Sequence, residues 1–190
     1  MPQPQPTSTP SLPPAESAPP GDPPPYSHPP ASGYRIALTT TSPFPPLQST
    51  LSPCSWDADR ESPIFFGSAI FARSVHPCKI APRLQPSCRV PYAGREYEHH
   101  GRYDLLPFIP AMMELVPTSR GLIPEDRHPI EGGYEETGEK LYHAMGSVNG
   151  IMVPGKTAEH LGGCNLPFGG GEHVLRENYS ILCWKQDVIS

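Results

Sequence analysis

Two lysines stand in matching short motifs and are the side chains best suited to bind a ligand. Lys79 ends the motif PCK, and Lys156 ends the motif PGK, 77 positions further along the chain. An ammonium group donates up to three hydrogen bonds, so it suits a ligand that is rich in oxygen atoms. Lysines in turns are usually solvated, but a solvated lysine has little reason to recur at one position of a repeated motif. We therefore interpret the two lysines as parts of two related binding sites.

A duplication about 76 residues apart surrounds these lysines. Residues 88–96 (CRVPYAGRE) match residues 164–172 (CNLPFGGGE), and residues 103–106 (YDLL) match residues 179–182 (YSIL). The spacing changes from 77 to 76 between the lysine and the cysteine, so one residue was gained or lost there. Repeats of this kind pack against each other, and neither is expected to be stable alone. The duplication predicts a pseudo-symmetric unit and makes a binding module the leading hypothesis.

The repeats have the character of antiparallel β-structure. Short β-prone runs such as residues 64–66 (IFF) and 151–153 (IMV) alternate with glycine turns, and no sustained helical period is present. We predict a mainly β fold in which two tandem pseudo-symmetric antiparallel repeats form one compact domain. Repeat one covers about residues 55–106 and repeat two about 130–184. The proline-containing residues 107–129 are predicted to be an irregular surface connection.

Composition separates the N-terminal part from this domain. Of 29 prolines, 16 lie in the first 50 residues, where few apolar side chains are available to form a core. Such a segment cannot offset its loss of conformational entropy by burial. Residues 1–50 are therefore predicted to be a disordered proline-rich tail, with residues 34–41 (YRIALTTT) as an exception that could add a strand. Residues 51–190 are predicted to form the tandem-repeat domain.

Charge and cysteine content limit the class of function. The net charge of −5 and the lack of a basic cluster argue against nucleic acids and anionic membranes as partners. No apolar run is long enough for membrane insertion, and no signal peptide is recognisable, which favours the cytoplasm. The five cysteines contain no Cys-x-x-Cys pair and are read as reduced thiols. No metal site, cofactor site or catalytic motif is expected, so we do not predict an enzyme.

The second copy resembles the DM9 repeat. The resemblance rests on residues 133–135 (GYE), 141–142 (LY), 154–156 (PGK), 167–173 (PFGGGEH) and 178–182 (NYSIL), in this order and spacing. With the first copy, it covers nearly all of the predicted domain. Members of this family form compact pseudo-twofold β domains with exchanged strands and include mannose-binding lectins. The repeat also accompanies the pore-forming domain of natterin-like toxins.

The resemblance implies a hexose site made by an acidic residue and the motif lysine. In the second repeat these positions are Glu135 and Lys156, where Glu135 replaces the usual aspartate. In the first repeat Lys79 is clear, whereas the acid is either Asp57 or Asp59. A carboxylate can accept from two vicinal hydroxyls while an ammonium donates to another, so the pairing suits a neutral, mannose-type glycan. Two weak sites would act through avidity, and a homodimer is a further possibility.

A second motif leads to an alternative function. Pro23, Pro24 and Tyr26 belong to a Pro-Pro-x-Tyr motif, which WW domains bind as a polyproline helix in an aromatic groove. In this alternative the protein is a non-enzymatic adaptor whose tail recruits a WW-domain partner. The two candidate functions are distinguished by whether the purified domain binds glycans.

Overall fold

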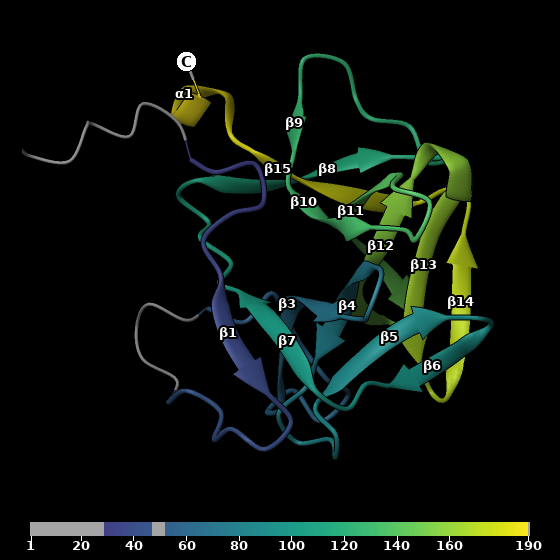
Figure 1. The fold of residues 1–190 in the computed structure, drawn as a ribbon. Coiled ribbons are helices and arrows are strands. Elements are labelled where there is room, and N and C mark those ends of the chain that lie inside the picture. Colours follow the sequence, from purple (N-terminus) through teal and green to yellow (C-terminus); the bar gives the residue numbers. More distant parts are fainter. Residues whose placement is uncertain (1–28, 47–51, 190) are drawn as a thin grey trace, which may run out of the picture.

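The computed structural model describes residues 29–46 and 52–189, and these residues form a mainly β domain (Figure 1). Repeat one contributes β3 (Pro63–Ile70), β4 (Val75–Ile80), β5 (Cys88–Tyr92), β6 (Arg95–Glu98) and β7 (Arg102–Leu106). Repeat two contributes β11 (Lys140–Val148), β12 (Ile151–Ala158), β13 (Gly163–Phe168), β14 (Gly171–Leu175) and β15 (Tyr179–Trp184). The predicted mainly β class with two tandem repeats is confirmed.

Both repeats pair their strands in the same order. In repeat one, β7, β3, β4, β5 and β6 are successive antiparallel neighbours. In repeat two, β15, β11, β12, β13 and β14 follow the same order. The two series meet where Arg95 of β6 pairs with Gly171 of β14, and Figure 1 shows these hairpins side by side. The join lies on the pseudo-twofold axis that the duplication predicts.

Each repeat is also preceded by a strand that reaches the other repeat. The strand β10 (Glu131–Tyr134) pairs with β11 of its own repeat and with β4 of repeat one. Its counterpart β2 (Ser55–Trp56) pairs with β3, and the Ser55 hydroxyl donates to the carbonyl of Met152 in β12 at 2.6 Å. The first strand of each repeat therefore contacts both halves of the domain.

The core has three clusters because the first long strand of each repeat is buried on both faces. Phe65 and Phe66 are neighbours in β3, so their side chains point to opposite faces of the strand. Phe65 packs in the cluster of repeat one, whereas Phe66 packs in a central cluster with Met145 of repeat two and Trp184. A third cluster belongs to repeat two. The central cluster holds the repeats together.

The ordered domain begins before residue 50. The strand β1 (Ile36–Thr39) pairs with β7, and Leu38 is buried in the cluster of repeat one. Arg35 donates to the Ser68 hydroxyl, the carbonyl of Glu131 and His143 Nε2 at 2.7 to 2.9 Å. The boundary predicted near residue 50 is therefore too late, because the exception at residues 34–41 does add a strand.

The connection between the repeats also contains regular structure. The strand β8 (Met113–Thr118) pairs with the whole of β15, and the short β9 (His128–Pro129) pairs with the end of β15. The position of β8 beside β15 matches that of β1 beside β7. The connection predicted to be irregular therefore contains a strand that completes the symmetry of the two repeats. A 3₁₀ turn (Glu159–Leu161) and a terminal helix α1 (Gln186–Ile189) complete the elements.

Candidate functional site

Three strands bring the predicted acid and lysine of repeat two together. Lys156 lies in β12, Glu135 directly follows β10, and His76 lies in β4 of repeat one. The pairing of Tyr134 with Val75 carries Glu135 from repeat two to His76 in repeat one. This site uses residues of both repeats.

Lys156 is almost completely buried, and its charge is surrounded by polar and aromatic groups. Its Nζ lies 3.7 Å from Glu135 Oε1, 3.1 Å from His76 Nδ1 and 5.7 Å from the centre of the Tyr92 ring. Glu135 Oε1 also lies 3.7 Å from His160 Nε2. The Lys156 ammonium and the Glu135 carboxylate are too far apart for a direct hydrogen bond, so each keeps capacity for a ligand.

Burial determines the protonation of the site. Desolvation lowers the pKa of Lys156, and the carboxylates of Glu135 and Glu172 partly offset this effect. Desolvation, together with the charge of Lys156, lowers the pKa of His76 to about 4. A neutral His76 whose Nδ1 accepts from the Lys156 ammonium carries its proton on Nε2. His76 Nε2 lies 3.1 Å from the Ser74 hydroxyl oxygen and 3.7 Å from Glu135 Oε2.

The equivalent lysine of repeat one is arranged differently. Lys79 is as buried as Lys156, but its Nζ donates to Glu96 Oε1 at 2.6 Å. Its charge also lies 5.3 Å from the ring of Phe168 in repeat two, as Lys156 lies over Tyr92 of repeat one. The ring contacts are therefore symmetric across the domain, whereas the carboxylate partners differ.

One pair of equivalent positions explains this difference. Asn165, the cross-strand neighbour of Lys156, donates its amide to Glu172 Oε1 at 2.7 Å. Arg89, the cross-strand neighbour of Lys79, pairs with Glu98 instead and leaves Glu96 to Lys79. The asparagine thus engages the local carboxylate of repeat two, and Lys156 remains available to Glu135.

Glu96 and Glu172 also join the repeats. Glu96 Oε2 accepts from the backbone N–H of Gly170 at 2.7 Å, and Glu172 Oε2 accepts from that of Gly94 at 2.6 Å. Each carboxylate therefore satisfies the hairpin turn of the opposite repeat, which is a structural function.

Strand register identifies the counterpart of Glu135 in repeat one. Ser55 pairs with Ile64 as Gly133 pairs with Leu141, which makes Asp57 equivalent to Glu135. The backbone agrees, because Asp57 N–H donates to the carbonyl of Ser62 at 2.9 Å, as Glu135 N–H donates to that of Glu139.

The alternative acid, Asp59, stabilises the turn that follows. It accepts from the N–H groups of Glu61 and Ser62 and pairs with Arg83, and these hydrogen bonds, led by that of the Ser62 hydroxyl, lower its pKa to about 2. Among the contacts of the described residues, neither Asp57 nor Asp59 bonds Lys79. Repeat one therefore lacks the acid and lysine pair that the sequence predicted there.

Sequence reasoning missed His76, His160 and the contact of Tyr92 with Lys156. Tyr92 is 37% exposed and stacks on Phe71. His76 has no histidine counterpart in repeat two, because position 153 is valine. Alignment of the two copies shows histidine at position 76 and valine at the equivalent position 153. The alignment does not show that β10 pairs with β4, which is the pairing that brings His76 close to Glu135.

We expect His76 to make the domain less stable in mild acid. Unfolded histidine binds a proton below about pH 6.5, whereas folded His76 does so only near pH 4, so the unfolded chain binds more protons between these values. The free energy of unfolding should fall through this window, with His76 accounting for about 2 kcal/mol. His76→Gln should remove that part of the decrease, and His128→Gln, at an exposed position, should not. Urea unfolding at several pH values measures both, and identical pH profiles for wild type and His76→Gln would contradict the assignment.

The motif residues Pro23, Pro24 and Tyr26 lie outside the described residues. Within residues 29–46 and 52–189, no helix is both long and apolar enough to cross a membrane.

Comparison with known proteins identifies the family. The model of the DM9 repeat matches residues 57–175, more than half of the chain, so this protein belongs to the DM9 repeat family. Its domain has the lectin-like fold of the carbohydrate-binding type, and the resemblance seen in the sequence is confirmed. A search of curated proteins found no match.

A solved structure shares the fold. The crystal structure of the nematode sperm cell motility protein MFP2B matches with a TM-score of 0.57 and 14% sequence identity. The match covers 80% of this chain but only 46% of MFP2B. At this identity the likeness concerns the fold alone.

Proposed function

We propose that this protein is a non-enzymatic lectin-like receptor for a mannose-type glycan, with its working site at Glu135 and Lys156. The observation that carries the proposal is the 3.7 Å separation of the two charged groups. A hydroxyl pair of a sugar can accept from the ammonium and donate to the carboxylate, and such charge-assisted bonds are stronger than neutral ones. Lys79 and Glu96 already satisfy each other, which supports one working site per chain.

The exposed side of the site suggests how a sugar enters. The Glu135 side chain is 23% exposed, whereas that of Lys156 is only 6% exposed. A ligand would thus meet the carboxylate first and reach the ammonium beyond it. Tyr92 has Lys156 near its ring and stacks on Phe71, so it would border the sugar with its exposed edge.

A matched pair of lysine variants tests the proposal. Lys156→Met should weaken binding of a methyl mannoside ten- to a hundredfold, about 1.5 to 3 kcal/mol, because it removes a charge-assisted donor. Lys79→Met changes an equally buried lysine that also contacts an aromatic ring, yet it should leave the affinity unchanged. Titration calorimetry gives the affinities, and a thermal melt of each variant shows that it is folded.

Two further results decide the matter. Glu135→Asp restores the residue of the lectin relatives and should hold or increase the affinity for mannose; a decrease would indicate a different glycan. If wild-type protein binds no glycan up to millimolar sugar, the proposal is wrong.

With one site per chain, avidity would require the homodimer that we proposed from the sequence. Binding to a dense glycan surface should then depend on dimer formation.

The location and the tail add to this proposal. All five cysteines are free thiols, which supports a reducing compartment and the proposed cytoplasmic location.

The second candidate function, recruitment of a WW-domain protein through Pro23, Pro24 and Tyr26, rests on the motif. Tyr26→Ala should abolish capture by WW domains without changing the melting temperature, because the tyrosine fills the groove of the partner.

A further inference from the structure

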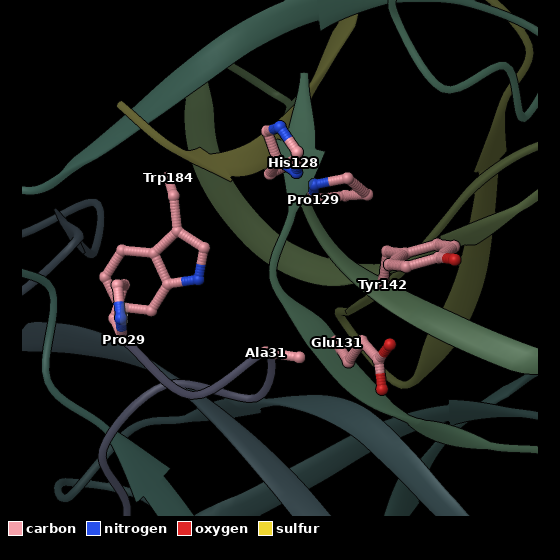
Figure 2. A pocket seen from close by; sticks show the side chains of 7 residues that line it. All are labelled: Pro29, Ala31, His128, Pro129, Glu131, Tyr142 and Trp184. Carbon is pink, nitrogen blue, oxygen red and sulfur yellow. The ribbon is translucent and has the colours of Figure 1, made fainter. Parts of the chain in front are cut away.

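A pocket with proline and aromatic walls adjoins the central cluster, to which Trp184 of its lining belongs. It has a volume of about 500 Å³ and lies between the segment before β1, the strands β9 and β10, and the ends of β11 and β15. Figure 2 shows its lining, which consists of Pro29, Ala31, His128, Pro129, Glu131, Tyr142 and Trp184. None of the residues of the proposed glycan site lines this pocket. It is therefore a separate candidate site.

The indole N–H of Trp184 is the unusual group of this pocket. Trp184 is only 2% exposed, and its Nε1 makes no hydrogen bond to any other described residue. In Figure 2 the indole nitrogen faces the space enclosed by Pro129, Tyr142 and Glu131. A buried donor without a partner costs about 1 to 3 kcal/mol, so a ligand that supplies an acceptor here is stabilised. A ligand with a carbonyl oxygen would supply such an acceptor.

The remaining walls favour a largely apolar ligand. The Glu131 carboxylate is the acidic group at the rim, and it is already paired with Lys140. Rings of Tyr142, Pro29 and Pro129 form flat apolar surfaces around the indole. Proline-rich peptides meet these conditions, because proline has no backbone N–H to satisfy and a polyproline helix leaves its carbonyls free. Aromatic grooves with such donors are the usual receptors of proline-rich peptides.

We propose that this pocket binds the proline-rich segment at residues 19–25 (PPGDPPP) of the same chain. Two facts single out this occupant: the segment ends four positions before Pro29, and Pro29 itself forms part of the rim. The residues between Pro25 and Pro29 span up to about 13 Å, enough to let the chain turn back into the pocket. A short tether gives a local concentration of about millimolar, so a weak contact suffices.

The indole resonance of Trp184 in the full-length chain tests the proposal directly. The comparison is with a full-length variant in which the five prolines of residues 19–25 are replaced by serine. In the wild type, the Trp184 indole N–H should be shifted downfield and exchange with water about tenfold more slowly, as expected when a tethered ligand holds the acceptor. Trp56, which is 48% exposed and lines a different pocket, provides an internal control whose resonance should not change.

A peptide of residues 17–27 added to each protein distinguishes the occupants. It should bind the serine variant and shift the Trp184 indole, and it should bind the wild type about tenfold more weakly because the tethered segment competes. Trp184→Phe in the serine variant should weaken the peptide about fivefold, since one hydrogen bond is lost. The resonance comparison needs no tryptophan substitution, so it remains decisive even if that variant folds poorly.

Several outcomes would overturn the proposal. Identical Trp184 resonances in the wild type and the serine variant would show that the segment does not reach the indole. Equal binding of the peptide to both proteins, or to neither, would exclude an intrachain ligand. A wild-type indole shift that disappears on dilution would assign the pocket to the tail of a second copy.

Discussion

Arg35→Met should reduce the free energy of unfolding by about 3 kcal/mol, although Arg35 lies in the part of the chain that composition assigns to a tail. Its guanidinium donates hydrogen bonds to Ser68 in β3, to the carbonyl of Glu131 in β10 and to His143 in β11. Burial lowers the pKa of Arg35 from 12.5 to about 10, which marks how far this charge is removed from water. Methionine fills the space but leaves buried acceptors without a donor. Urea unfolding followed by circular dichroism measures the loss.

The matched control for this prediction is Arg73→Met. Arg73 is exposed, and its contact with Glu136 is 3.9 Å long, so its removal should change stability by about 0.5 kcal/mol or less. Equal midpoints for wild type and Arg35→Met would show that the segment before β1 contributes little to the domain.

Gly133→Ala should reduce the free energy of unfolding by about 3 kcal/mol or more and should also impair the proposed glycan site. The backbone of Gly133 has φ +153°, and an added Cβ would lie 2.0 Å from the carbonyl oxygen of Val75. That overlap is with backbone, so β10 would have to move away from β4 and carry Glu135 with it. The unfolding free energy and the mannoside affinity should therefore fall together.

Gly171→Ala is the control for adding a methyl group in a strand. A Cβ at Gly171 would have its first neighbour at 3.8 Å, an ordinary contact. This variant should keep the stability and the affinity of the wild type within about 0.5 kcal/mol. A Gly133→Ala protein that melts like Gly171→Ala would show that β10 does not need its close approach to β4.

Short glycine-containing motifs were sufficient to predict the hairpin turns of the repeats. The dipeptides Ala93-Gly94, Asn149-Gly150 and Gly169-Gly170 all have positive φ values, and each joins two antiparallel strands as the glycines predicted. The equal spacing of the copies likewise predicted the equal order of their strands. These features depend on residues close in sequence, or on comparison of one copy with the other.

The features that were missed depend on residues far apart in sequence. Residues 171–175 form the strand β14 because β13 pairs with it along its whole length. Asp57 and Asp59 could not be separated without the register of β2 on β3. His76 became part of the site only through contacts across 59 and 80 positions, with Glu135 and Lys156.

The exchanged strands β2 and β10 have an evolutionary consequence. A single repeat would lose the pairing of β10 with β4 and the contact of Ser55 with β12 unless a second copy supplied them, which is the arrangement of a homodimer with an isologous interface. In such a dimer every substitution occurs twice, and both sites must change together. In one chain that constraint is absent. Within one chain, Asn165 and Arg89 can differ, so that Glu96 pairs with Lys79 while Glu172 accepts from Asn165.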